Sequence, residues 1–185
     1  MTQRIQPIDP AAAQGQAKRL LDGVAAQLGS VPNIFKTFAQ SPAVLEGYLS
    51  FSGALAKGTL GAKLREQIAL TVAGANGCDY CASAHRFLAK AAGVDSDEVV
   101  RNLQGKANDA RTAAALQFAQ VLVVKRGQVS DNELKAVQSA GFSDEEIVEI
   151  IGNVAVNLFT NYFNHVAETE IDFPVVNTGS IASAA

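Results

Sequence analysis

The 185-residue sequence contains no tryptophan, one methionine, two histidines and two cysteines, and aromatic residues make up only 6% of it. Runs of lysine or arginine are absent and the formal net charge is −3, which argues against a nucleic-acid-binding surface. No uninterrupted apolar stretch is long enough to cross a bilayer, and residues 1–7 lack the apolar core of a signal peptide. From these absences we expect a cytoplasmic protein that binds neither nucleic acid nor membranes.

Apolar residues, by contrast, make up 48% of the chain, which is enough for one sizeable core at this length. They recur at helical spacing in nearly every periodic segment, and no segment shows sustained strand alternation. The pattern predicts a single all-α domain over residues 1–176. Residues 177–185 are small and polar, and we expect them to form a flexible C-terminal tail.

Breaks and capping signals between the periodic segments locate the predicted helices. Ser130 and Ser143 each stand three residues before a glutamate, which is the spacing of a capping box at a helix start. Gly77 and Gly93 each close a periodic segment. Helices are expected at 17–28, 34–39, 42–56, 63–75, 78–92, 95–103 and 109–125, from 130 onward, and at 144–168.

One spacing occurs twice along the chain. Glu66 precedes His85 by the same interval at which Glu146 precedes His165, and each interval begins soon after a predicted helix start. One hypothesis is a degenerate duplicated helical hairpin whose second copy has lost the cysteines of the first. We expect His165, which has several asparagines nearby, in a buried polar network or a subunit contact.

Both cysteines lie in one motif, Cys78-Asp79-Tyr80-Cys81, and a thiol pair this close can form a disulfide with each other. The motif opens a predicted helix, where unpaired N–H groups and the positive end of the helix dipole favour a thiolate. His85 follows Cys81 by four residues, so the two side chains share one helix face. These residue types and spacings favour a dithiol redox site.

Glu66 can join this site only through tertiary structure. If the helices before and after Gly77 form an antiparallel hairpin, Glu66 and His85 fall within about one helical turn of each other. The carboxylate could then orient the imidazole, with its proton-accepting nitrogen toward Cys81. Two alternatives stay open: the cysteines could be small apolar residues of a packed interface, or they could bind zinc with the histidine and a carboxylate.

The spacing Glu66-(x)11-Cys78-x-x-Cys81-x-x-x-His85 resembles the signature of the AhpD-like alkylhydroperoxidases, in the carboxymuconolactone decarboxylase superfamily. Residues 31–33 and 164–174 resemble its peroxidase-related branch. The resemblance implies an AhpD-like helical bundle and homo-oligomers, commonly trimers or hexamers. It also implies that Cys81 is the peroxidatic cysteine, that Cys78 is resolving and more exposed, and that Glu66 and His85 form a proton relay. Where founding members carry a histidine before the second cysteine, this chain has Tyr80, a candidate relay member.

The function that the resemblance implies is that of a thiol peroxidase without a cofactor or a metal. A hydroperoxide oxidises Cys81, Cys78 closes the disulfide, and a dithiol or thioredoxin-like donor reduces it. Two alternatives remain, namely a lactone decarboxylase-type enzyme of the same superfamily and a redox-sensing interaction protein. Lactone decarboxylases of the superfamily generally lack the paired cysteines, which disfavours the first. A sensor would need the same disulfide but no fast turnover.

Overall fold

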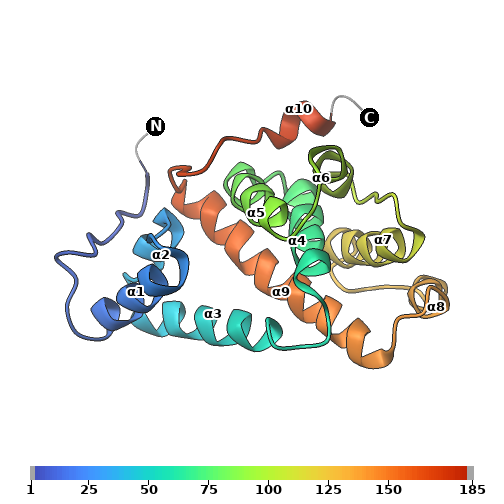
Figure 1. Ribbon diagram of the computed structural model, residues 1–185, viewed down its shortest axis with the longest axis horizontal. Coiled ribbons are helices and arrows are strands. Elements are labelled where there is room, and N and C mark those ends of the chain that lie inside the picture. Colours follow the sequence, from blue (N-terminus) through green and yellow to red (C-terminus); the bar gives the residue numbers. More distant parts are fainter. Residues whose placement is uncertain (1–2, 183–185) are drawn as a thin grey trace.

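The computed structural model describes residues 3–182, and within them it contains helices and no strand, which confirms the all-α prediction (Figure 1). The elements are α1 (Gly15–Leu28), α2 (Asn33–Phe38), α3 (Pro42–Leu55), α4 (Ala62–Asn76), α5 (Asp79–Ala91), α6 (Ser96–Leu103), α7 (Ala110–Val124), α8 (Asp131–Ser139), α9 (Asp144–Ala167) and α10 (Thr178–Ala182). Over the same residues, none of the helices combines the length and the hydropathy that a membrane-spanning segment needs.

Helix α4 lies at the centre of the fold and packs against α5, α6, α7 and α9 (Figure 1). Its residues 67–73 are all buried, so it has no solvent-facing stripe in this stretch. Gly74 allows α4 to approach α6 closely, because a Cβ at this position would collide with the carbonyl oxygen of Leu103. Contacts on several sides therefore hold α4, the helix that carries Glu66, in place.

The buried apolar residues form two clusters. One joins α1, α2, α5 and the segment after α9, and it contains both cysteines. The other joins α4, α7, α8 and the first half of α9. The cysteine motif therefore sits inside the first part of the core and not on a surface loop.

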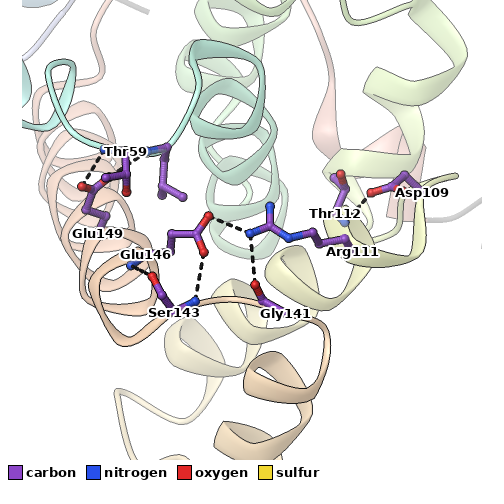
Figure 2. A network of polar contacts seen from close by, with 9 residues as sticks. Thr59, Asp109, Arg111, Thr112, Gly141, Ser143, Glu146 and Glu149 are labelled. Atoms are coloured by element: carbon purple, nitrogen blue, oxygen red, sulfur yellow. Dashed lines mark hydrogen bonds and ion pairs between the residues drawn. The ribbon is translucent and has the colours of Figure 1, made fainter.

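Polar side chains fix the start of the long helix α9 against its neighbours (Figure 2). Glu149 accepts hydrogen bonds from the backbone N–H groups of Thr59 and Leu60, at 2.7 and 2.9 Å, and so holds the loop between α3 and α4. Glu146 pairs with Arg111 at 2.6 Å and closes a capping box with Ser143. The second capping box, at the start of α8, also forms, and both sequence predictions are confirmed.

The contribution of Glu149 to stability is expected to depend on pH. Burial raises the pKa of this carboxyl, but hydrogen bonds from Thr59 and Leu60 outweigh burial, and the pKa lies below its ordinary value. A depressed pKa means that the ionised group stabilises the fold above the unfolded pKa of about 4.3, and that this stabilisation is lost as the pH falls through the folded pKa. Glu149→Gln should therefore lower the free energy of unfolding by about 1–2 kcal/mol at neutral pH.

Urea unfolding measures this effect at neutral pH and again at successively lower pH. The difference from wild type should shrink toward zero below about pH 4, where the wild-type carboxyl also becomes protonated. Glu145→Gln, on the exposed side of the same helical turn, is the control and should change little. An equal loss at every pH would show that the charge of Glu149 is irrelevant.

The duplicated-hairpin hypothesis is wrong. Glu66 and His85 lie on two helices, α4 and α5, which are separated by a turn at Gly77. Glu146 and His165 lie on one continuous helix, α9. His165 is exposed, so its expected place in a buried network is also wrong, whereas its place in a subunit contact stays a prediction.

After α9 the chain returns past α5 and ends in the short helix α10, which packs on α6 (Figure 1). We name residues 169–178 the C-terminal strap. The backbone N–H and the hydroxyl of Thr178 both donate to Asp79 Oδ1, at 2.9 and 2.6 Å. The start of the expected flexible tail is thus bound to α5, and residues 183–185 lie outside the described part of the chain.

Candidate functional site

The cysteine motif begins directly at the turn between α4 and α5. Gly77 has a φ of 66°, a left-handed conformation that suits glycine and ends α4. Cys78 is the N-cap of α5, and the backbone N–H of Cys81 donates to its sulfur at 3.3 Å. The two cysteines form a disulfide, with Cα atoms 5.3 Å apart, within the usual range. The short turn therefore positions the pair for bridging.

The two sulfurs differ in their surroundings. Cys81 lines a cavity, although only 3% of the residue is exposed. Cys78 is 1% exposed and packs in the same buried cluster as Val176 of the C-terminal strap. The expectation that Cys78 is the more exposed cysteine is wrong for this chain, because the strap covers the N-terminal end of α5.

Glu66 and His85 meet across the α4–α5 hairpin, as the spacing predicted. Glu66 Oε2 lies 2.8 Å from His85 Nδ1, and the two side chains are 22% and 20% exposed. Because the carboxylate occupies Nδ1, proton exchange with other groups has to use Nε2. His85 also lines the cavity that Cys81 borders. His85, paired with Glu66, and Cys81 therefore border the same cavity.

The cavity has a volume of about 160 Å³ and is mostly apolar. Its walls come from the end of α1, the α1–α2 loop, α2, α3, α5, α9 and the C-terminal strap. The lining residues are Leu28, Ser30, Pro32, Ile34, Phe35, Tyr48, Tyr80, Cys81, Ala84, His85, Phe87, Leu88, Thr160, Asn164 and Phe173. An apolar cavity of roughly 150 Å³ is known to hold a benzene ring. The site can therefore accept a compact apolar molecule next to Cys81.

Asn164 is a site residue that sequence reasoning did not identify. Its Nδ2 donates to Cys81 Sγ at 3.3 Å. It belongs to a buried row on α9, with Asn153, Asn157 and Asn161 three or four residues apart. Asparagine repeated at helical spacing in an apolar helix was the available signal, because such amides need buried polar partners. The sequence alone did not show that one of those partners is a cysteine sulfur.

Tyr80 makes its hydrogen bonds to groups other than Glu66 and His85. The phenol donates to Asp172 Oδ1 at 2.9 Å and accepts from the backbone N–H of Ile34 at 3.2 Å. Burial raises the pKa of Tyr80 well above its ordinary value, so the phenol is neutral at physiological pH. We infer that Tyr80 ties the C-terminal strap and α2 to the motif, whereas the relay role expected from the sequence stays a prediction.

Tyr80→Phe separates these two roles. Removal of the hydroxyl leaves Asp172 and the Ile34 N–H short of a partner, so the free energy of unfolding should fall by about 1–3 kcal/mol. The resemblance to peroxidases predicts peroxide turnover, and if Tyr80 only anchors the strap, this turnover should stay within about threefold of wild type. Tyr162→Phe, an exposed tyrosine on α9, is the matched control. A hundredfold loss of turnover with unchanged stability would instead establish the relay role.

The side chains of the motif that could bind a metal are already bonded or paired with other side chains. The two sulfurs are bonded in a disulfide and His85 is paired with Glu66. Across residues 3–182, no group of three or more His, Cys, Asp or Glu side chains is arranged to hold a metal ion. Among the described residues, the motif consists of a disulfide next to a Glu66–His85 pair.

The segment that carries this site matches a known family model. Residues 42–124 match the model of the carboxymuconolactone decarboxylase family, and this range contains Glu66, Cys78, Cys81 and His85. The comparison with curated proteins finds no match. Among solved structures, an alkylhydroperoxidase AhpD core, a peroxidase-related protein from Ralstonia eutropha JMP134, aligns with a TM-score of 0.83 and 24% identity over 92% of both chains.

Two further solved structures show the same fold. A peroxidase-related protein from Silicibacter sp. TM1040 has a TM-score of 0.79 and 21% identity over 92% of both chains. The debrominase Bmp8, as a C82A variant in complex with 2,3,4-tribromopyrrole, has a TM-score of 0.79 and 19% identity over 100% of this chain and 98% of its own. Residues 42–124 thus match the carboxymuconolactone decarboxylase family model across the cysteine motif, and the chain shares the fold of these AhpD-like structures.

Proposed function

We propose that the chain is a thiol-dependent peroxidase that reduces organic hydroperoxides through Cys81. The observation that carries the proposal is the position of Cys81, which is bridged to Cys78 and borders an apolar cavity shared with His85. Glu66 lies behind His85 at 2.8 Å and can hold the imidazole in one tautomer. The likeness to peroxidase-related proteins of the same fold agrees with this assignment.

The first step is oxidation of Cys81. His85 Nε2 takes the thiol proton, and the thiolate attacks the terminal oxygen of the hydroperoxide ROOH. The S–O bond forms as the O–O bond breaks, and the departing alkoxide takes a proton from the imidazolium. One thiol and one hydroperoxide thus become one sulfenic acid and one alcohol, ROH.

The second and third steps return the enzyme to its dithiol form. Cys78 attacks the sulfenic sulfur of Cys81, which forms the disulfide and releases water. An external dithiol, or a thioredoxin-like donor, then reduces the disulfide by exchange and is itself oxidised. Because Cys81 borders the cavity and Cys78 lies under the strap, the donor should attack the Cys81 sulfur more readily.

Location and assembly complete the proposal. A cytoplasmic location would keep the CxxC reduced between turnovers. Exposed apolar side chains on α3 and α9, among them Phe51, Val148 and Ile151, favour self-association, which we propose as a trimer or hexamer. Light scattering coupled to size-exclusion chromatography measures the mass, and a monomer at micromolar concentration would contradict this part.

The peroxidase assay follows the loss of hydroperoxide in the presence of dithiothreitol and catalytic amounts of protein. Cumene hydroperoxide should be consumed faster than hydrogen peroxide, since burial of the ring in the apolar cavity adds affinity that hydrogen peroxide lacks. Fast turnover would also separate an enzyme from a redox sensor, which needs only one slow oxidation. Consumption no faster than with dithiothreitol alone would contradict the proposal.

A second candidate function is reductive dehalogenation of a small aromatic molecule. The single-ring size of the cavity and the cysteine in its wall favour it, together with the debrominase of the same fold. Two thiols and an aryl bromide would yield the disulfide, the debrominated ring and hydrogen bromide. Bromide release from tribromopyrrole with a dithiol present tests it, and release without hydroperoxide consumption would favour this function over the first.

A further inference from the structure

We propose that the side-chain amide of Asn164 is a catalytic group with two tasks at Cys81. Its Nδ2 stabilises the Cys81 thiolate, and its Oδ1 accepts a hydrogen bond from the terminal O–H of the bound hydroperoxide. The second task rests on the peroxidase function proposed above, whereas the first concerns the sulfur alone. The two can therefore be tested separately.

The contact of Asn164 with the sulfur carries the first task. Nδ2 lies 3.3 Å from Cys81 Sγ, and Asn164 is only 5% exposed. A hydrogen bond to an anion is roughly twice as strong as one to a neutral group, so this donor favours the thiolate over the thiol. Cys81 needs such a donor because its burial disfavours the charged form.

The other end of the amide carries the second task. Asn164 Oδ1 is buried and has no hydrogen-bond partner within the described residues. A buried acceptor without a donor is costly, and exchanging the two amide atoms would turn the oxygen toward a sulfur that, as a disulfide or thiolate, has no hydrogen to donate. The sulfur therefore fixes the orientation of the amide and leaves Oδ1 in need of a donor.

The hydroperoxide supplies that donor at the correct atom. Asn164 lines the cavity together with Cys81 and His85. The O–H of ROOH is on its terminal oxygen, which is the atom that the thiolate attacks. An amide bonded to Sγ through Nδ2 and to this O–H through Oδ1 would hold the two reacting atoms side by side.

This arrangement is consistent with the proton balance of the reaction. The S–O bond forms while the O–O bond breaks, and the terminal oxygen keeps its hydrogen and stays bonded to Oδ1 as the sulfenic S–O–H. The electron pair of the O–O bond leaves with the alkoxide, which takes its proton from His85. Asn164 thus binds the attacked oxygen, and His85 protonates the leaving oxygen.

The first test measures the thiolate directly and needs no peroxidase activity. In a Cys78→Ser background Cys81 is the only thiol, and serine preserves the N-cap. Asn164→Ala should lower the thiolate fraction near neutral pH about tenfold, read from ultraviolet absorbance against pH. Asn164→Asp should lower it further, since the carboxylate has the same size but repels the anion. Asn161→Ala, one turn earlier and bonded to Asn76, is the control and should leave the titration unchanged.

The second test compares two reagents at a pH where Cys81 is fully ionised in every variant. Iodoacetamide requires only the thiolate, so Asn164→Ala should react with it at nearly the wild-type rate. Oxidation by cumene hydroperoxide should remain at least about tenfold slower, because the acceptor for its O–H is gone. Asn164→Asp keeps an acceptor, so it should lose less of the hydroperoxide rate than Asn164→Ala. It also replaces the alanine variant in this test if that variant does not fold.

Each outcome decides one part of the proposal. An unchanged Cys81 titration in both Asn164 variants would overturn the first task. Equal losses with iodoacetamide and hydroperoxide at full ionisation would overturn the second. A wild-type protein that reduces no hydroperoxide, with a titration that still responds to Asn164, would refute the peroxidase function and the second task but leave the first intact.

Discussion

Replacement of Cys81 by serine is expected to lower the rate of hydroperoxide reduction by at least about a thousandfold. A serine hydroxyl is hardly ionised near neutral pH and cannot form the sulfenic acid that the first step requires. Cys81 is also the sulfur that lines the cavity, and the rest of the wall would be unchanged. The measurement is the rate of cumene hydroperoxide loss with dithiothreitol as donor.

Cys78→Ser is the matched control for this variant, since it removes the other sulfur of the same disulfide. It should still consume about one hydroperoxide per chain in a single turnover, because Cys81 remains, but it cannot form the disulfide. A result in which Cys78→Ser loses the single turnover and Cys81→Ser keeps it would reverse the two roles. Full activity in both variants would show that the reaction does not use the thiols.

Replacement of His85 by alanine is expected to lower the rate of Cys81 oxidation by about 10²- to 10⁴-fold, the usual contribution of a general acid–base group. In the proposed mechanism, both the thiol proton and the proton for the leaving alkoxide pass through this imidazole. Glu66→Gln should cost less, about tenfold, because the amide oxygen can still accept from Nδ1 but no longer balances the imidazolium charge. Single-turnover oxidation of the reduced protein measures both.

Added imidazole gives the control for the histidine variant. If His85 acts by proton transfer, free imidazole should enter the space left by the side chain and restore part of the lost rate. Lys90→Ala changes an exposed cation on the same helix and should have no effect. Wild-type rates in His85→Ala without imidazole would mean that the Glu66–His85 pair is structural only.

The sequence predicted the parts of the site that depend on local geometry. The proximity of Glu66 and His85, which lie 2.8 Å apart, follows from the rise of a helix and the position of Gly77, both of which can be read along the chain. The place of Cys78 as the N-cap of α5 follows equally from the break before it. Such relations hold within one hairpin, whatever the rest of the fold does.

The parts that were missed depend on how distant elements cross. Asn164 reaches Cys81 from α9, 83 residues away, and no helical period encodes the angle at which α9 passes α5. The C-terminal strap has no periodicity, so the bonds of Asp172 and Thr178 to α5 were not predictable. The expected repeat is absent for a local reason. In the second copy, Asn157 takes the position that Gly77 has in the first, and α9 continues through Asn157 without a turn.

The most direct test is mass-resolved labelling of the reduced protein before and after one equivalent of cumene hydroperoxide. Both thiols should be alkylated beforehand. After rapid mixing, both should be protected, the mass should fall by two hydrogens, and one hydroperoxide should be consumed per chain, because Cys81 is oxidised and Cys78 closes onto it. Two thiols that remain open to alkylation, with the hydroperoxide unconsumed, would contradict a peroxidatic Cys81.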